Sequence, residues 1–530
     1  MRLQRSLAAR CRRPQALLWR QLSRPLATAA VPVTQAAGVP TYNRDFASYP
    51  NVQVHLGVGG FHRSHQAHYL HELLEGPGSD GWALCGFGLM PQDAAMAAAL
   101  RSQDHLYTVL SQGPQGSSTT VIGSIMDYVL MSEDPTAAVE RLASEQVKIV
   151  SLTITEKGYC LGVDFRLDLK HPLISAELPV GSPPKSALGL MYAGLAMRKA
   201  KGMAPFTIMS CDNMPGNGHI AKEILLQFAK ARAAAGDGDA AGVVAWIEDG
   251  VVAFPSTMVD RITPVTEASH KQLLKDEHGI DDQCPVVAED FKQWVIEDNF
   301  PLGRPPWEHV GALMASGESG VEVYEAMKLR LLNGTHSALS YVSYLSGHRL
   351  VSDAMADPAV LGFVSAYLDE VIVTVPQVDG ISLPDYRSAL IERFSNVHIR
   401  DTVLRLAEDG SQKLQTTMRD VLLEQLAAKR DFPAMSLAIG GWIKFMAGTD
   451  DHGNVIDGIK DPMADRLKEL SLVVLANPTA ETTAPLLTEF FGEGVGGNPV
   501  AAQSVADAVA TLLRTDGGTH VVLKSRYSGK

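Results

Sequence analysis

Cysteine is scarce in this chain of 530 residues. The five cysteines are Cys11, Cys85, Cys160, Cys211 and Cys284, and no two of them form a CxxC pair. This spacing excludes the usual cysteine pattern of a structural zinc site and the dense pairing of a disulfide scaffold, and it is typical of proteins in a reducing compartment. We therefore predict a protein without a bound metal.

Long apolar runs and basic blocks are also missing from the body of the chain. No stretch approaches the roughly 18 consecutive apolar residues of a membrane-spanning helix. The net charge of -13 argues against a nucleic-acid-binding surface. The expected partners are therefore small molecules, with no nucleic acid and no membrane. At 530 residues the chain is too long for a single core, so we expect two large domains.

Acidic residues are absent from the first 44 positions. This segment carries eight arginines, interleaved with Leu, Ala and Ser, and the first acidic residue is Asp45. Such a composition is typical of an amphipathic import presequence. We predict that residues 1–44 are a cleaved presequence that directs the protein to the mitochondrial matrix, with Arg20 and Arg24 near the processing site. A plastid transit peptide, or a disordered basic tail on a cytoplasmic protein, are the alternatives.

A glycine-rich turn follows the first predicted strand. Val52, Val54 and Leu56 alternate as in a short strand, which runs into the segment GVGGFHRSHQAHYLHELL. In dinucleotide-binding folds such a turn lets the backbone approach the pyrophosphate, and the following helix supplies its positive N-terminal end. The third glycine of the usual GxGxxG pattern is replaced by a histidine, so a purely structural turn is the alternative. The predicted cofactor-binding residues here are Gly57, Val58, Gly59, Gly60, Phe61, His62 and Arg63.

One acidic residue after the second predicted strand indicates which cofactor is used. The strand covers Ala83 to Gly88, and Asp93 follows it. A carboxylate at this place accepts hydrogen bonds from the adenosine ribose and repels a 2′-phosphate, which favours NAD over NADP. A helix-capping role for Asp93 is the alternative.

Polar side chains follow two later strands. Tyr107 to Leu110 and Thr119 to Ile122 form a predicted hairpin, whereas residues 147–155 and 206–210 form predicted buried strands. Glu156 and Asn213 come directly after these buried strands, where open α/β sheets place their ligands. Asn213 is a candidate donor to an oxyanion, and Glu156 is a candidate proton relay. Local turn or capping roles are the alternatives for both residues.

A predicted helix from Tyr324 to His336 carries three polar side chains on one face. At about 100° per residue, Lys328, Asn333 and His336 fall within roughly 140° of one another. Three leucines, at 329, 331 and 332, predict that this helix is partly buried. Apolar surroundings lower the pKa of an amine towards the range of a general base. A solvated lysine, an Asn-Gly helix end and a core histidine are the alternative interpretation.

Six segments in this order resemble the polyol-specific long-chain dehydrogenases, the mannitol dehydrogenase family. They are GVGGFHRSHQAHY, SLTITEKGYC, SCDN, FPSTMVDRITP, EDFKQWVIEDNF and KLRLLNGTHSAL, and the similarity covers about residues 50 to 525. The resemblance implies an α/β fold: an N-terminal Rossmann-type NAD-binding domain followed by a mostly α-helical C-terminal domain. It also implies an active site between the domains and metal-independent hydride transfer. A Pro/Gly-rich stretch at 301–306 leads us to expect domains at 45–318 and 319–530.

The resemblance also implies roles for individual residues. Lys328 matches the general base of the family, Asn213 and Asn333 match the amides that hold the substrate oxygen, and His336 matches the imidazole that positions the reacting hydroxyl. Asp260, in MVDRITP, is expected at the same site, although a structural Asp-Arg salt bridge is the alternative. Arg405 and Lys413 match two basic positions around the sugar hydroxyls.

The expected reaction is the NAD-dependent interconversion of mannitol and fructose, on a polyol or ketose substrate, by a monomer or weak homo-oligomer. The segments TEKGYC, PPKSA and DGSQK resemble fructuronate reductases equally well. Arg405 favours a neutral polyol, but a cation there also suits the carboxylate of a uronate. Fructuronate reductase, arabinitol dehydrogenase and a non-catalytic sugar-binding protein are the alternatives.

Overall fold

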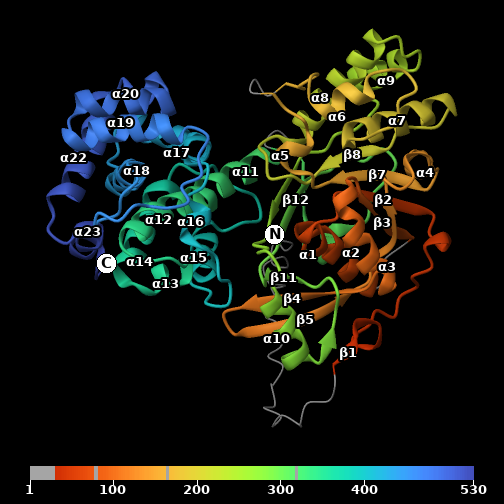
Figure 1. Cartoon of the computed structure of the whole chain (residues 1–530), viewed down its shortest axis with the longest axis horizontal. Helices are drawn as coiled ribbons and strands as arrows, with labels where there is room; N and C mark the ends of the chain where they lie inside the picture. The colour runs from red at the N-terminus through yellow and green to blue at the C-terminus, as the bar shows by residue number, and fades with distance from the viewer. Residues whose placement is uncertain (1–29, 77–80, 163–165, 317–319, 530) are drawn as a thin grey trace, which may run out of the picture.

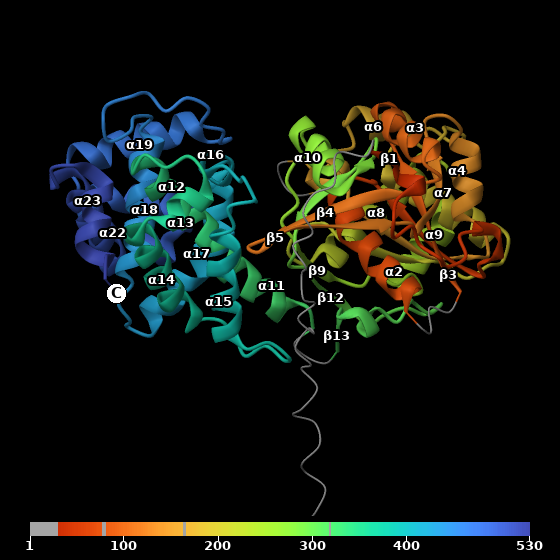
Figure 2. The same cartoon turned by 90° about the horizontal axis from the view of Figure 1, so that it is seen from below.

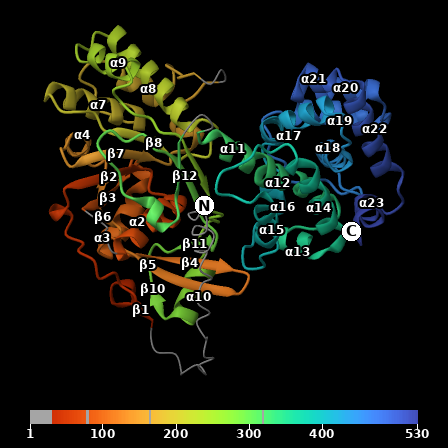
Figure 3. The same cartoon turned by 180° about the vertical axis from the view of Figure 1, so that it is seen from behind.

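The computed structural model describes residues 30–76, 81–162, 166–316 and 320–529. Most of the expected presequence, residues 1–29, lies outside this range. The described chain forms two lobes (Figure 1), one that contains the strands and one that is built from the helices after residue 320. Views from below and from behind show the same division, with α11 (Glu322–Lys328) between the lobes (Figures 2 and 3).

A five-stranded parallel sheet forms the centre of the first lobe. Its strand order is β6-β3-β2-β7-β8. The strands are β2 (Asn51–Leu56), β3 (Trp82–Gly88), β6 (Ile125–Leu130), β7 (Val147–Leu152) and β8 (Thr207–Ser210). Because all neighbours are parallel, their carboxyl ends meet at one edge, and the direction of winding reverses at β2. Ligands bind at such a reversal point in open α/β sheets.

Helices and smaller sheets complete this lobe. The helices are α1 (Gly60–Ser64), α2 (Gln66–Glu75), α3 (Ala94–Ser102), α4 (Pro135–Leu142), α5 (Thr155–Gly158), α6 (Pro172–Glu177), α7 (Ala187–Ala200), α8 (Asn217–Ala234), α9 (Ala240–Glu248) and α10 (Ala268–His278). The other strands are β1 (Val31–Pro32), β4 (Tyr107–Gly113), β5 (Gly116–Ile122), β9 (Thr257–Asp260), β10 (Ile280–Asp281), β11 (Val286–Glu289), β12 (Gln293–Glu297) and β13 (Leu313–Ala315). Helix starts follow the capping rules: the Asp134 side chain accepts the Ala137 N–H at 3.0 Å, and Pro135 begins α4.

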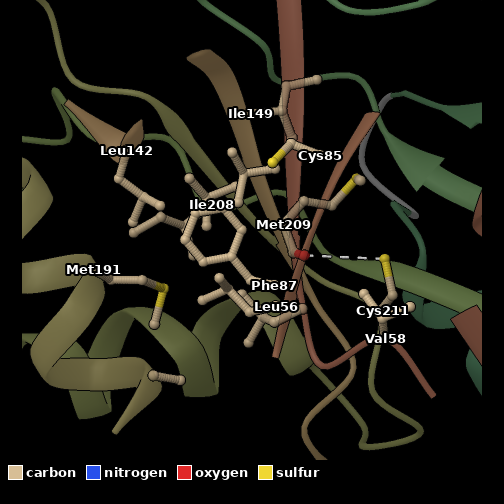
Figure 4. Packing of buried hydrophobic residues seen from close by; sticks show 14 of the residues in the cluster. Leu56, Val58, Cys85, Phe87, Leu142, Ile149, Met191, Ile208, Met209 and Cys211 are labelled. Atoms are coloured by element: carbon tan, nitrogen blue, oxygen red, sulfur yellow. Dashed lines mark hydrogen bonds between the residues drawn. The ribbon is translucent and has the colours of Figure 1, made fainter. Parts of the chain in front are cut away.

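The core of this lobe lies between the sheet and its helices. Figure 4 shows Phe87 and Ile208 of the sheet together with Leu142 of α4 and Met191 of α7. The two strands that supply Phe87 and Ile208 are buried along their whole length, as expected for a parallel sheet that is covered on both faces. Cys85, Cys160, Cys211 and Cys284 are free and buried.

The second lobe is helical. It contains α12 (Gly334–Leu345), α13 (Val351–Ala356), α14 (Pro358–Ile372), α15 (Leu383–Phe394), α16 (Val403–Leu406), α17 (Gly410–Ala427), α18 (Pro433–Met446), α19 (Ala464–Ala476), α20 (Ala480–Phe491), α21 (Glu493–Gly496), α22 (Pro499–Arg514) and α23 (Gly518–Tyr527). Helix α18 is buried on nearly all sides, in keeping with its apolar sequence. The core of this lobe also includes Met258 of β9 and Val295 of β12, so the two lobes share an apolar contact.

Residues 31–44 are part of the first lobe. Strand β1 pairs in parallel with β10, and Val33 is buried in a small apolar cluster with Leu106 and Ile280. Arg44 forms an ion pair with Asp104 at 2.6 Å and donates to Gly123 O at 3.1 Å. Part of the segment that we expected to be a presequence is therefore packed on the domain, and its cleavage stays a prediction.

Most predicted strands are present. The predicted hairpin is confirmed as the antiparallel pair β4 and β5. The strand predicted at 147–155 is shorter than expected, because the chain leaves the sheet after Leu152 and Thr155 adopts a left-handed conformation with φ of 59°. Within the described ranges, no helix combines the length and the apolar character needed to cross a membrane.

Candidate active site

The turn after β2 has the geometry of a phosphate-binding loop. Gly57 has φ of 88°, and a Cβ atom there would lie 2.5 Å from Thr153 O, so only glycine fits. A Cβ atom at Gly59 would meet nothing within 4 Å, which leaves its backbone open to a ligand. Helix α1 begins at the next residue and directs its first N–H groups towards the turn.

A hollow lies beside this turn at the carboxyl edge of the sheet. It is lined by Gly57, Val58, Gly59, Leu89, Met90, Asp93, Thr153, Ile154, Gly158, Leu173, Ser186 and Ala187. Most of these residues follow β2, β3 and β7, the strands around the reversal point, whereas Leu173 lies in α6 and Ser186 and Ala187 are at the start of α7. The open backbone of the turn and the nearby carboxylate fit the pyrophosphate and ribose of a dinucleotide.

Asp93 has the capping role that was the alternative interpretation, and it also lies in the hollow. Its Oδ2 accepts the backbone N–H groups of Leu89 and Met90 at 2.8 and 2.9 Å, which caps the start of the 3-10 turn Pro91–Asp93. The same residue lines the hollow. The cap therefore fixes a carboxylate at the place where a ribose would bind.

Four of the predicted cofactor contacts do not line this hollow: Gly60, Phe61, His62 and Arg63. His62 is buried and stacks on His55 of β2, with ring centroids 3.4 Å apart. The Arg63 guanidinium donates to Cys284 O and lies over the Tyr107 ring. Neither side chain lines the hollow, so the prediction that they contact the cofactor is corrected. Where the usual third glycine permits close packing of helix and strand, two flat imidazole rings fill the space here.

Gly60 and Phe61 also contribute to the architecture of the turn. Gly60 is the first residue of α1, and a Cβ atom there would touch Val286 and Thr263 at 3.5 and 3.6 Å. The Phe61 ring stacks on His65 with centroids 4.9 Å apart. The missing Cβ atom of Gly60 thus lets the start of α1 lie close to β11 and to the segment that follows β9.

A second hollow surrounds Lys328. It is lined by Asp212, Asn213, Met214, Pro215, Thr257, Met258, Val259, Glu325, Lys328 and Leu329. The Lys328 ammonium donates to Asn213 Oδ1 and to Val259 O, both at 2.6 Å. Burial lowers the pKa of Lys328 below its ordinary value; the Asp260 carboxylate opposes this shift, and the Arg393 guanidinium adds to it. A lowered pKa makes the neutral form of an amine, which can accept a proton, more accessible.

The helix that carries Lys328 changes its winding directly after this residue. Leu329–Asn333 form a π-helical segment, η5, between α11 and α12. In such a segment the hydrogen bonds join residues five apart, so Asn333 lies about one turn from Lys328 and closer to its face than a regular helix predicts. The angle of roughly 140° that a regular helix predicts between the Lys328 and Asn333 side chains is therefore too wide. Asn333 is half-buried at the end of this segment.

His336 follows on α12 and is uncharged. Burial lowers its pKa to about 3, although the Asp401 carboxylate opposes the shift. Its ring contacts the Phe394 ring, with centroids 4.7 Å apart. A neutral imidazole can donate or accept one hydrogen bond to a substrate hydroxyl.

Asp260 binds an arginine from the other lobe. It ends β9, and its two oxygens accept from Arg393 of α15 at 2.9 and 2.8 Å. Burial alone would raise the pKa of Asp260, but the Arg393 guanidinium holds it below its ordinary value. The neighbouring Arg261 instead donates to Glu289 O at 3.0 Å and to Ser111 Oγ at 3.1 Å. A structural Asp-Arg salt bridge is therefore present at Asp260, with Arg393 rather than the neighbouring Arg261 as its partner.

Arg405 and Lys413 do not line the hollow around Lys328. The Arg405 side chain is 59% exposed and donates from Nε to Asp401 Oδ1 at 2.6 Å. Lys413 Nζ lies 3.5 Å from Leu406 O. The charges of Asp401 and Arg405 both act on His336, which places this pair on the His336 side of the site.

Glu156 is exposed on α5 and does not line either hollow. A different glutamate, Glu325, lies in the hollow one helical turn before Lys328, and both of its oxygens accept the Gly216 N–H at 3.1 Å. Burial raises the pKa of Glu325 to about 7. The sequence interpretation missed this residue, although its spacing of three from Lys328 on a predicted helix was a usable signal.

No metal site accompanies these groups: within the described part of the chain, no three His, Cys, Asp or Glu side chains gather in a way that could hold an ion.

Two family descriptions together cover most of the chain. "Mannitol dehydrogenase Rossmann domain" matches residues 51–309, and "Mannitol dehydrogenase C-terminal domain" matches residues 320–513. These matches confirm the predicted resemblance and the predicted fold class.

Curated relatives and solved structures agree with this result. The chain is 39% identical to Mannitol 2-dehydrogenase of Aspergillus oryzae over 481 residues, which is 90% of this chain and 93% of that protein. It is 41% identical to Mannitol dehydrogenase 2 of Saccharomyces cerevisiae over 434 residues, 81% of this chain and 84% of that protein. The structure of Pseudomonas fluorescens mannitol 2-dehydrogenase with NAD and D-mannitol matches with a TM-score of 0.75 at 37% identity, covering 92% and 96% of the two chains. A substrate-free D-sorbitol dehydrogenase matches with a TM-score of 0.79 at 32% identity, covering 91% and 96%.

Proposed function

The chain belongs to the mannitol dehydrogenase family, and on that premise we propose that it interconverts D-mannitol and D-fructose with NAD. The observation that carries this proposal is the buried Lys328 ammonium, held between Asn213 Oδ1 and Val259 O. Oxidation of a secondary alcohol needs a base for the hydroxyl proton and donors for the developing negative charge on oxygen. Lys328, Asn213 and Asn333 supply these groups.

The cofactor is NAD, and the residues of the first hollow fit it. The backbone from Gly57 to Gly59 would bind the pyrophosphate, and Asp93 would bind the ribose hydroxyls. NAD supplies the hydride acceptor for alcohol oxidation, and its reduced form supplies the donor for ketose reduction.

Lys328 begins the oxidation as the neutral amine and takes the proton of the reacting hydroxyl. Its bond to Asn213 Oδ1 orients that amide, so that Asn213 Nδ2 is left to donate to the substrate oxygen together with Asn333. The neutral His336 imidazole hydrogen-bonds a substrate hydroxyl. Glu325, whose pKa burial raises to about 7, lines the same hollow and can take the proton onward from Lys328.

The environment of Arg405 supports a neutral substrate. Its guanidinium pairs with Asp401, so this basic group on the His336 side is already balanced by a carboxylate. A uronate needs an arginine fork free for its own carboxylate. A polyol needs only directed donors and acceptors, which favours mannitol and fructose over mannonate and fructuronate. Arabinitol has the same neutral chemistry and stays the nearest alternative substrate.

We also propose a location and an assembly state. The arginine-rich first 29 residues support import into the mitochondrial matrix. Since residues 31–44 pack on the first lobe, processing before Val31 would leave the fold intact. The shared core of the two lobes lies within one chain, which supports activity as a monomer or weak homo-oligomer.

One comparison separates an enzyme from a sugar-binding protein with the same fold. NADH oxidation is followed at 340 nm with D-fructose, and the thermal midpoint is followed with the same sugar. Turnover of NADH supports the proposal, whereas a rise in the thermal midpoint without any turnover contradicts it.

A further inference from the structure

Arg393 crosses from the helical lobe into the strand-containing lobe. It lies on α15, but its guanidinium is enclosed between Asp260 and Glu289, and all three side chains are at most 6% exposed. Besides the two bonds to Asp260, Arg393 donates from Nε and Nη2 to the Glu289 oxygens at 2.9 and 2.8 Å. The Phe291 ring lies 4.1 Å below the guanidinium carbon. This is a buried cation with two carboxylates, and it is adjacent to the residues that hold Lys328.

We propose that Arg393 is a positioning residue for proton transfer: it fixes the Asp260 carboxylate beside Lys328 and balances its charge, so that Lys328 can work as a neutral base. The inference rests on the proposed function of Lys328. It assigns a role to a residue that touches neither the hollow around Lys328 nor that of the cofactor.

The charges around Lys328 support this role. Lys328 interacts with Asp260 of β9, Arg393 of α15 and Glu325 of α11. His336 of α12 also faces Asp260 and Arg393, and it is uncharged. If the guanidinium were removed, the Asp260 carboxylate would act on the ammonium without a competing cation. Lys328 would then hold its proton more tightly and act as a base only at higher pH.

The shape of the Arg393 guanidinium contributes to the orientation of Asp260, in addition to its charge. Glu289 is itself fixed, because Ile262 N–H donates to its Oε1 at 2.6 Å and Arg261 contributes a further positive charge nearby. Tyr386, on the same helix as Arg393, faces the same carboxylates. Two parallel bonds to Asp260 therefore set the plane of that carboxylate against a rigid support, which an ammonium group cannot reproduce.

The test uses Arg393→Gln and Arg393→Lys in the full chain, with Arg387→Gln as the matched control. Arg387 lies on the same helix but pairs with Asp369, which is 64% exposed. We expect Arg393→Gln to move the acidic limb of the kcat/KM profile for mannitol oxidation upward by about one pH unit or more. Arg393→Lys should keep that limb in place and lower kcat/KM by about tenfold, because the charge stays and the fork is lost. A wild-type profile in a folded Arg393→Gln protein, or an equal shift in Arg387→Gln, overturns the proposal.

A second readout does not need polyol turnover. The pH dependence of Lys328 labelling by trinitrobenzenesulfonate, measured by mass spectrometry of its peptide, reports the titration of this amine directly. We expect the pH midpoint of Lys328 labelling to rise in Arg393→Gln and to be unchanged in Arg387→Gln. If wild type turns over no polyol while this shift is present, the proposed substrate is wrong and the role of Arg393 stands. If Arg393→Gln does not fold, the Arg393→Lys variant decides: unchanged kcat/KM there overturns the proposal.

Discussion

Lys328 Nζ lies 2.6 Å from Asn213 Oδ1, although the two residues are 115 positions apart and belong to different lobes. Asn213 follows β8 at the carboxyl edge of the parallel sheet, and Lys328 ends α11 at the start of the helical lobe. An amine on one lobe thus donates directly to an amide oxygen on the other. The site exists only when the two lobes are in contact, and it is adjacent to the edge where a dinucleotide binds.

The first prediction concerns the base. Lys328→Ala should lower kcat for mannitol oxidation by about 10²-fold or more, because general-base catalysis contributes about 10² to 10⁴. The variant should still bind NADH, since Lys328 does not line the cofactor hollow. Steady-state kinetics and NADH fluorescence titration measure the two effects. Near-normal turnover in the Ala variant would show that another group takes the proton.

The second prediction concerns cofactor choice. Asp93→Asn keeps an oxygen for the Leu89 and Met90 N–H groups but removes the charge, whereas Asp93→Ala removes both. Both variants should narrow the preference for NAD over NADP, because a carboxylate repels the 2′-phosphate. Only the Ala variant should also lower the thermal midpoint. A wild-type enzyme that prefers NADPH would contradict the placement of Asp93 beside the ribose.

The third prediction concerns stability in acid. Burial lowers the pKa of His62 and of His65 to about 3 in the folded chain. Below about pH 6.5, the ordinary pKa of a histidine, the unfolded chain binds more protons than the folded chain. The two histidines therefore do not reduce the unfolding free energy above about pH 6.5, and they reduce it progressively as the pH drops towards about 3. Each histidine should cost about 2 kcal/mol of unfolding free energy at pH 5.

Urea denaturation at pH 7 and pH 5 measures this loss. His62→Phe keeps a flat ring against His55 and removes the titrating group, so it should reduce the difference between the two pH values. His452→Gln, at an exposed position, is the control and should not change the difference. If wild type and His62→Phe lose the same unfolding free energy between pH 7 and pH 5, protonation of His62 is not a cause of the loss.

The fourth prediction concerns Arg405. A polyol is uncharged, so Arg405 can act on it only through hydrogen bonds, each contributing about 1.5–3 kcal/mol because the donor is charged. Fructose reduction should therefore be nearly insensitive to ionic strength, and Arg405→Ala should lower kcat/KM while leaving NADH affinity unchanged. Kinetics at several salt concentrations test this expectation. A steep loss of kcat/KM with added salt would indicate a charged substrate.

Local sequence patterns were sufficient for much of the fold and of the site. The alternation before Gly57 and the apolar runs around residues 150 and 208 predict strands directly. A strand that is buried on both faces is recognisable from its own apolar residues, without knowledge of its neighbours in the sheet. The positions of Asn213 and Asp93 followed from the rule that ligands bind at the carboxyl ends of such strands. The resemblance to a family supplied the roles of Asn333 and His336.

Long-range contacts set the limit of prediction from sequence. Arg393 is 133 positions from Asp260, and no local pattern indicates that the two side chains meet. The π-helical segment after Lys328 packs against α14 and α17, and the local sequence pattern predicted a regular helix there. His62 was misassigned for the same reason: its partner, His55, lies on the preceding strand, and the stacked pair forms only once helix and sheet have packed together.

The central claim is tested most directly by kcat/KM with D-fructose and with D-fructuronate, measured with NADH under identical conditions and repeated in Arg405→Ala. The proposed function predicts a higher kcat/KM for fructose than for fructuronate, and a lower value for fructose in the variant. A tenfold preference for fructuronate that disappears in Arg405→Ala would contradict it and would identify the protein as a uronate reductase.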